Sequence, residues 1–163
     1  MPELPEVEVV KQSLDRKIKF QKINKVVVRN RNLRFVIPKN FEFFLKNKKI
    51  NKISRISKYL IFHLNNNTFL IIHLGMSGTI HLGSKKNYNN TNTSFYGSSN
   101  LPIKHNHILI FLKKNQFIYN DPRRFGFIKI LNSKLELLNY FKNVGPEPLD
   151  DKFDINYLHN YLK

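Results

Sequence analysis

Short runs of apolar, β-favouring residues recur through the middle of the chain, and they restrict the possible folds more than any other feature. Runs of this length are typical of strands buried on one or both faces. Polar breaks at 65–67 and 114–115 predict hairpin turns between runs. The runs are 25–29, 50–64, 69–81, 108–113, 116–119 and 127–131. We therefore predict a mainly β fold, an antiparallel β-sandwich with flanking helices.

A helix precedes these strands. Pro5 suits the first turn of a helix, where its missing N–H is not needed. We predict that this helix spans residues 5–17. Its apolar stripe recurs at steps of three and four residues, at Val7, Val10, Leu14 and Ile18.

Two segments depart from the β pattern. Residues 83–101 are polar and lack periodicity, so we expect a mobile surface loop there. Gly-Pro-Glu-Pro-Leu at 145–149 predicts a stiff linker, and a helical spacing restarts at Phe153. We predict a first domain over 1–144, with 145–163 forming the linker and the beginning of a helical domain.

Charge and composition limit the possible partners. The chain has 28 Lys and Arg against 11 Asp and Glu, a formal net charge of +17, which favours polyanions such as nucleic acid. A general bias toward Lys and Asn explains the charge equally well. The absence of Cys excludes disulfides and Cys-ligated zinc within these residues. No apolar run approaches 18 residues, so we expect a cytoplasmic protein without a membrane partner.

Pro2 follows the initiator Met1, and a small second residue normally permits removal of Met1. Pro2 would then carry a free secondary amine. Such an α-amino group is roughly 10–15% unprotonated at pH 7, whereas an ordinary Lys is below about 0.1%. Attack of the amine on an aldehyde carbon gives a cationic iminium, which is an electron sink for elimination. The N-terminus therefore predicts lyase chemistry on a sugar.

Three charged residues are candidates to assist this amine. Glu3 and Glu6 lie at the positive end of the predicted helix, where a carboxylate stays charged and can exchange protons with a sugar oxygen. Simple stabilisation of the helix explains Glu6 equally well, whereas adjacency to the amine favours a functional Glu3. Lys58 begins a run whose same-face neighbours are apolar, although a surface lysine at a strand end is the simpler interpretation of this residue alone.

Six blocks of the sequence resemble, in the same order, those of the formamidopyrimidine-DNA glycosylases. Leu4 favours this family over the related endonuclease eight branch, which has Gly at that position. The blocks are MPELPEVE at 1–8, KYL at 58–60, HLGMSG at 73–78, KHNH at 104–107, DPRRFG at 121–126 and GPEPL at 145–149.

The resemblance implies a base-excision repair enzyme. The resemblance implies that Pro2 is the Schiff-base nucleophile, that Glu3 is the proton donor of the glycosylase step and that Lys58 is the proton donor of β-elimination. The enzyme would remove oxidised purines such as 8-oxoguanine and formamidopyrimidine, and then cleave the abasic strand by β,δ-elimination. Its partner would be double-stranded DNA containing such lesions or abasic sites, bound by a monomer associated with the nucleoid. This chemistry needs no metal or organic cofactor.

An enzyme that acts on a base inside a duplex must extrude the nucleotide and fill the gap. Met76, Arg123 and Phe125 are similar to the family's gap-filling residues. Ordinary core packing is the alternative for Met76 and Phe125. His105 resembles a DNA-contacting position, and His73 is explained equally well as a DNA contact or as a structural histidine.

The chain also departs from the family's full-length pattern. That pattern continues through a helix-two-turn-helix motif into a zinc finger, whereas this chain ends inside what resembles the first helix of the motif. Zinc is expected only in that missing part, and half of the DNA clamp is absent. A truncated, noncatalytic basic DNA-binding module is the rival interpretation. The joint presence of Pro2, Glu3 and Lys58 argues against it.

Overall fold

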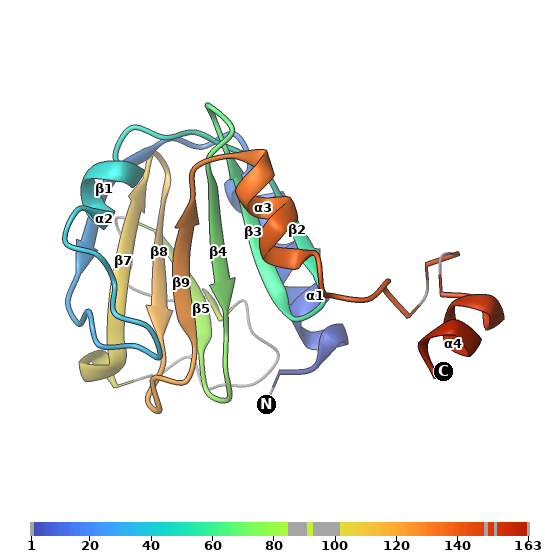
Figure 1. Ribbon diagram of the computed structural model, residues 1–163. Helices are drawn as coiled ribbons and strands as arrows, with labels where there is room; N and C mark the ends of the chain where they lie inside the picture. The colour runs from blue at the N-terminus through green and yellow to red at the C-terminus, as the bar shows by residue number, and fades with distance from the viewer. Residues whose placement is uncertain (1, 85–90, 93–101, 149, 152, 163) are drawn as a thin grey trace.

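The computed structural model describes residues 2–84, 91–92, 102–148, 150–151 and 153–162. Two antiparallel sheets face each other as a sandwich (Figure 1), which confirms the predicted fold class. The strands are β1 (Ile23–Val28), β2 (Ile50–Ile56), β3 (Tyr59–Leu64), β4 (Phe69–His73), β5 (Thr79–Ser84), β6 (Thr91–Asn92), β7 (Asn106–Leu112), β8 (Asn115–Asn120) and β9 (Phe127–Leu131). One sheet has the order β1-β7-β8-β5-β6 and the other β2-β3-β4-β9.

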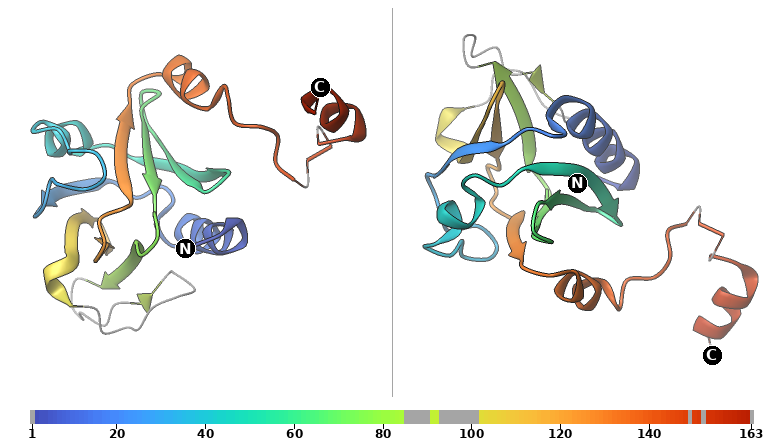
Figure 2. Two further views of the ribbon diagram at one scale, coloured as in Figure 1. Left: turned by 60° about the horizontal axis from the view of Figure 1, so that its bottom comes forward. Right: turned by 90° about the horizontal axis from the view of Figure 1, so that it is seen from above.

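The main core lies between the sheets and is closed along one edge by the first helix. The helices are α1 (Leu4–Ile18), α2 (Phe41–Leu45), α3 (Lys134–Phe141) and α4 (Ile155–Tyr161), with a 3-10 turn η1 (Ile103–His105). Helix α1 packs along β2 (Figure 2). All four residues of its predicted apolar stripe are buried in this core.

The second sheet is covered on both faces over part of its area. Helix α3 lies on its outer face, where a second apolar cluster forms around Ile61, Phe69, Ile71, Leu131 and Phe141. A sheet that is covered on both faces needs apolar residues on both faces, so apolar and polar residues do not alternate along its strands. This explains the uninterrupted apolar sequence of β3 and β4.

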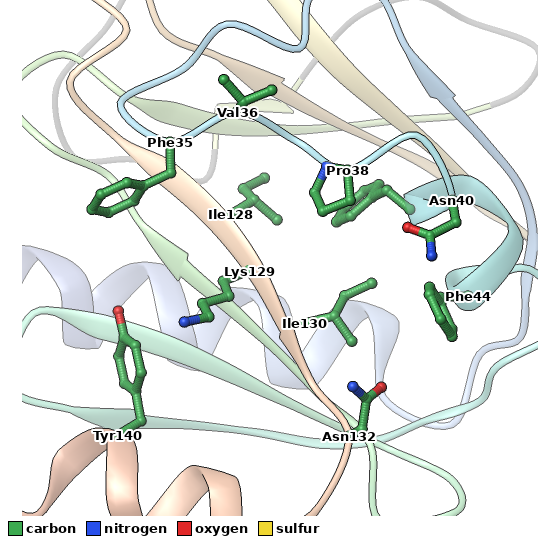
Figure 3. A pocket seen from close by; sticks show the side chains of 11 residues that line it. Phe35, Val36, Pro38, Asn40, Phe44, Ile128, Lys129, Ile130, Asn132 and Tyr140 are labelled. Atoms are coloured by element: carbon green, nitrogen blue, oxygen red, sulfur yellow. The ribbon is translucent and has the colours of Figure 1, made fainter.

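Beside α3, the edge strand β9 borders a groove of about 610 Å³. Aromatic and aliphatic side chains from the loop before α2, from α2 and from β9 line most of it (Figure 3). Its polar lining comes from Asn40, Lys129, Asn132 and the hydroxyl end of Tyr140. None of the residues predicted to carry chemistry lines this groove.

Two predicted runs each divide into two strands, the first as a hairpin and the second as two strands that belong to different sheets. The run 50–64 divides at Ser57-Lys58, where Ser57 has a φ of 49°. The run 69–81 divides over residues 74–78 between β4 and β5. The first turn lacks the glycine-containing pairs that mark a turn in a sequence, whereas the second contains such a pair, Ser77-Gly78, between two apolar runs.

The predicted loop over 83–101 is also corrected in part. Gly83 and Ser84 belong to β5, and residues 91–92 form β6. The rest of that loop lies outside the described residues. The Asn turn at 65–67 is confirmed, whereas the second predicted turn comprises Lys113 and Lys114, because Asn115 already begins β8.

Helices α2 and α3 were not predicted. Helix α2 has five residues, too few to show a helical period. Helix α3 does carry a start signal: Ser133 accepts a hydrogen bond from the Glu136 N–H at 3.1 Å, and Glu136 accepts one from the Asn132 N–H at 2.9 Å. This Ser-x-x-Glu pattern is the sequence signature of a capping box, although the return hydrogen bond here comes from Asn132, one residue before the cap.

The last helix agrees with the restart of helical spacing near Phe153. Asp154 caps α4 by accepting a hydrogen bond from the Tyr157 N–H at 2.7 Å. No side chain of α4 is buried, and the helix stands apart from the sandwich in both views (Figures 1 and 2). Within the described part of the chain, no helix is long and apolar enough to cross a membrane.

The burial of α1 leads to a stability prediction. Leu14→Ala removes a side chain with 0% exposure, and we expect it to lower the free energy of unfolding by about 2–5 kcal/mol. Val9→Ala on the same helix, where Val9 is 47% exposed, should change it by less than about 0.5 kcal/mol. Urea denaturation measures both. Equal losses would contradict the packing of α1 by its predicted face.

Candidate active site

The residues predicted to carry chemistry gather at one end of the sandwich. Strand pairing brings Tyr59 opposite His73, and His73 opposite Phe127. The β2–β3, β4–β5 and β8–β9 turns therefore lie together, and the N-terminus of α1 reaches the same end (Figure 1). Segments from four distant parts of the sequence form this face, which we call the catalytic end.

Pro2, Glu3 and Lys58 meet there. The Lys58 Nζ lies 2.5 Å from Glu3 Oε2, and Glu3 directly follows Pro2. Both charged side chains retain exposure to solvent, Glu3 more than Lys58. The Lys58 ammonium and the Glu3 carboxylate therefore meet at a point that a ligand can reach from solution, one residue along the chain from Pro2.

Glu6 has a structural contact at this end. The backbone N–H of Glu3 donates a hydrogen bond to Glu6 Oε2 at 2.9 Å. Glu6 is the third residue of α1, so this contact satisfies an N–H group that the start of a helix leaves without a partner in the helix. The carboxylate of Glu6 thus fixes the backbone that presents Glu3.

The turn that carries Lys58 is held by two residues that the sequence analysis did not single out. The Arg55 guanidinium donates to Glu8 Oε2 at 2.9 Å, to Glu147 Oε2 at 2.7 Å and to the Ser57 carbonyl at 2.8 Å. The other oxygen of Glu147 accepts from the Ser57 N–H at 2.6 Å. Because Glu147 belongs to the predicted linker, the linker is part of the site's support.

The network sets the charge states of its members. Burial raises the pKa of Glu8, but hydrogen bonds from Lys11, Arg55 and Gln12 outweigh it and lower the pKa to about 2. Burial alone would lower the pKa of Arg55. The hydrogen bonds and charges of Glu147 and Glu8 outweigh burial, so the pKa of Arg55 is raised. A carboxylate with a depressed pKa stabilises the fold above its ordinary pKa of 4.5 and loses that contribution as pH falls toward 2.

A buried carboxylate joins the other two turns of the catalytic end. Asp121 is fully buried and accepts hydrogen bonds from the Ser77 hydroxyl at 2.5 Å, the Tyr119 hydroxyl at 3.2 Å and the Gly126 N–H at 2.9 Å. The Ser77 hydroxyl in turn accepts from the Arg123 N–H at 3.1 Å. The β4–β5 and β8–β9 turns are thereby fixed to each other.

The two turns approach so closely that only glycine fits between them. A Cβ on Gly75, whose φ is +64°, would lie 2.4 Å from the Gly126 backbone nitrogen. A Cβ on Gly126 would lie 2.0 Å from the Tyr119 hydroxyl oxygen. Gly75 of the HLGMSG block and Gly126 of the DPRRFG block therefore permit the two backbones to approach closely.

Met76, Arg123 and Phe125 project from these joined turns. Met76 is 43% exposed and Phe125 47% exposed, so neither is an ordinary core residue. The Arg123 guanidinium lies over the Phe125 ring, 4.8 Å from its centre, which keeps both side chains together on the surface. The structure thus presents a hydrogen-bonding cation against one apolar side chain, with a second exposed apolar side chain, Met76, on the turn joined to theirs.

The two candidate histidines lie at the edge of this face. His73 is half-buried, its ring stacks on Phe127 with centres 5.5 Å apart, and its Nδ1 accepts from the Gly75 N–H at 3.1 Å. Burial, Arg34 and Lys58 lower the pKa of His73. His105 is half-buried at the end of η1, and its carbonyl accepts from the Asp121 N–H at 3.1 Å.

Sequence reasoning missed Arg55, Asp121 and Glu147 as parts of the site. Asp121 and Glu147 lie inside blocks that it had noticed, but their side-chain partners are distant in sequence. Among the described residues, no three His, Asp or Glu side chains gather closely enough to hold a metal ion.

Comparison with known proteins agrees with this geometry. Residues 1–128 match the family model of the formamidopyrimidine-DNA glycosylase N-terminal domain. A formamidopyrimidine-DNA glycosylase of Wolbachia pipientis from Culex pipiens is 44% identical over the whole chain, and one of Rickettsia bellii is 39% identical over 99% of it. The chain spans 55% of the length of both relatives.

Solved structures agree as well. The Lactococcus lactis Fpg bound to DNA containing an abasic site is 32% identical, with a TM-score of 0.82 over 99% of this chain and 56% of that one. A G226P variant of the same protein, bound to DNA containing Fapy-dG, is 33% identical with a TM-score of 0.82 over 99% and 55% of the two chains. The chain therefore belongs to the family of the formamidopyrimidine-DNA glycosylase N-terminal domain.

Proposed function

We propose that this chain carries the catalytic part of a base-excision repair glycosylase that removes oxidised purines and then cleaves the abasic strand. The observation that carries the proposal is the meeting of Pro2, Glu3 and Lys58 beside the exposed group of Met76, Arg123 and Phe125. Chemistry on a sugar needs the first set, and extrusion of its base needs the second. The similar Lactococcus lactis protein has been solved with DNA that contains an abasic site.

The amine of Pro2, once Met1 is removed, attacks C1′ of the damaged nucleotide while the bond from C1′ to the base breaks. The departing base takes up the proton that the amine loses. Glu3 donates a proton to the sugar ring oxygen as the C1′–O4′ bond breaks, which leaves an iminium at C1′. The iminium accepts the C–H electron pair when the C2′ proton is lost to solvent, and the enamine so formed expels the 3′ phosphate. Lys58 supplies the proton of this elimination. Its ion pair with Glu3 supports a shared proton-transfer role for the two side chains.

The exposed turns serve to hold an opened duplex. Met76 and Phe125 can fill the space left by an extruded nucleotide, and Arg123 can donate to the unpaired base opposite. His105 and the half-buried His73 lie at the edge of the same face, where a ring N–H can reach a phosphate. The steps assigned here use protein groups alone, without a metal or organic cofactor.

The role of Pro2 predicts a single covalent adduct. Borohydride reduction with abasic DNA should trap the chain through residue 2, and retention of Met1 should abolish trapping because an amide has no nucleophilic lone pair. Lys58→Ala should slow strand cleavage at least about tenfold while sparing the adduct. Mass spectrometry locates the adduct. An adduct on Lys58, or efficient trapping by Met1-retained protein, contradicts the assignment, and no trapping favours a noncatalytic binding module.

The position of Arg123 predicts a role in reading the opposite base. Arg123→Ala should reduce discrimination between opposite bases about tenfold, as expected for a contact worth about 1–3 kcal/mol, and reduce trapping on an existing abasic site much less. Arg124→Gly is the matched control, because it removes the same charge and glycine suits the φ of 58° at that position. Excision assays on duplexes with each opposite base measure the effect. Equal losses in both assays would assign Arg123 to backbone binding.

The contacts of Glu147 with Arg55 and Ser57 predict that Glu147 positions Lys58. Glu147→Gln weakens the contact with Arg55 that holds the turn, and we expect strand cleavage to slow about tenfold, or about 1.4 kcal/mol in the barrier. Trapping through Pro2 should change little. Glu136→Gln, in the capping box of α3, is the control for loss of a carboxylate. If both variants cleave equally fast with unchanged thermal stability, Glu147 does not position the lysine.

A further inference from the structure

The end of the sandwich opposite the catalytic end carries a concentrated positive charge. Strand β3 runs from Tyr59, beside Lys58, to Leu64, so the two ends are about 20 Å apart. Backbone hydrogen bonds bring the C-terminus of α1, the start of β2 and the β3–β4 turn together here, including Phe20 N–H to the Ile50 carbonyl and Asn65 N–H to the Lys49 carbonyl. The exposed lysines that define this lysine end are Lys19, Lys22, Lys49, Lys52 and Lys134.

The lysine end places like charges against each other. Lys22 and Lys49 lie directly opposite in an antiparallel bridge, an arrangement that is unfavourable for two cations. In the described part of the chain, the one carboxylate within ion-pair distance of these five lysines is Asp15, 3.9 Å from the Lys19 Nζ. A general excess of lysine accounts for their number but not for this placement. The uncompensated charge is complementary to a polyanion.

An exposed aromatic ring lies among the cations. Phe20 is 63% exposed and has a φ of 64°, a conformation that disfavours a bulky residue. The Lys19 and Lys49 ammonium groups lie 5.1 and 5.5 Å from the centre of its ring. A ring held in the open between two cations is suited to stack on a base whose phosphates the lysines contact.

Phe20 also borders a groove of about 590 Å³. Its floor includes Leu64 and Phe69, both buried, and Lys52 and Lys134 lie on its rim. His63 lines it as well, its Nε2 2.6 Å from the Ser54 hydroxyl oxygen. The apolar floor is recessed and Phe20 is the one apolar side chain of this lining that projects, whereas a lipid surface requires a broad projecting apolar face. The groove therefore fits a strand of nucleic acid better than a membrane.

We propose that the lysine end is a second nucleic-acid site, which binds single-stranded DNA by stacking a base on Phe20 and by contacts of the lysines with phosphates. The site itself is independent of the proposed glycosylase activity. The choice of DNA rests on the proposed function, which brings the chain to DNA.

The test uses a new fluorophore at the site. The chain contains no tryptophan, so Phe20→Trp introduces a single one where the base should stack. Titration with a 12-residue oligothymidylate should quench its emission, and raising salt from about 50 to 200 mM should weaken binding about tenfold or more. Absence of quenching at low salt would overturn the proposal.

Charge reversal separates this site from general attraction. In the Phe20→Trp background, Lys22→Glu with Lys49→Glu should weaken binding about tenfold or more. The matched control is Lys25→Glu with Lys129→Glu, which changes the net charge equally at exposed positions elsewhere and should weaken binding less than about threefold. Equal effects of the two pairs would overturn the proposal.

A further variant guards against loss of folding. Phe20→Gly removes the ring and suits the positive φ, so the chain should stay folded while a fluorescein-labelled oligothymidylate binds about fivefold more weakly. Unchanged binding overturns the stacking role. Tighter binding of an oligouridylate, or a response only to phosphatidylglycerol vesicles, overturns the choice of ligand.

Failure of the lysine-end site can be distinguished from failure of the proposed glycosylase function. The Lys22→Glu, Lys49→Glu variant should retain borohydride trapping on abasic DNA, since neither lysine lies at the catalytic end. A chain with Met1 retained should lose trapping and still quench the fluorophore. Loss of trapping in the lysine variant would overturn the independence of the two sites.

Discussion

The catalytic end depends on the guanidinium of Arg55, whose side chain is 12% exposed. It ties α1 through Glu8, the hairpin turn through the Ser57 carbonyl and the linker through Glu147. A cation with so little exposure is tolerated only when its donors are paired, and here two carboxylates and a carbonyl pair them. Removal of one partner would leave part of this donor set unpaired at low exposure, so the three segments are kept together. The contact between Lys58 and Glu3 follows from this geometry, because each belongs to one of the segments.

Asp121 has the corresponding role for the exposed turns, with neutral donors in place of a cation. Hydroxyl and backbone N–H groups satisfy its oxygens, and two glycines permit the backbones to approach. The result is a rigid base from which Met76, Arg123 and Phe125 project into solvent. Large apolar groups at the surface cost free energy, so a firm support beneath them is consistent with a binding role.

Much of the fold could be predicted because its signals are local. The stripe of α1 and most of the strands are recorded in the period of the apolar residues, and the capping box of α3 was present though unused. The Ser57-Lys58 turn was hidden, since its positive φ falls on Ser and depends on support from Glu147, ninety residues away in the sequence. The same reason applies to the site. Pro2, Glu3 and Lys58 were identifiable through ordered blocks, whereas Arg55 and Asp121 matter through partners that only tertiary structure brings near.

The strand order has a consequence for how the chain acquires its structure during synthesis. Val28 in β1 pairs with Ile108 in β7, and Phe69 in β4 pairs with Leu131 in β9, so each sheet joins early and late parts of the chain. Such non-local pairing makes folding slow, because long loops must close before the contacts form. The hairpin of β2 and β3 with α1 can assemble as the ribosome releases it, but the two sheets cannot cover each other's apolar faces until β7 and β8 emerge. A nascent chain that stalls earlier exposes the interior of the sandwich and is a substrate for chaperones.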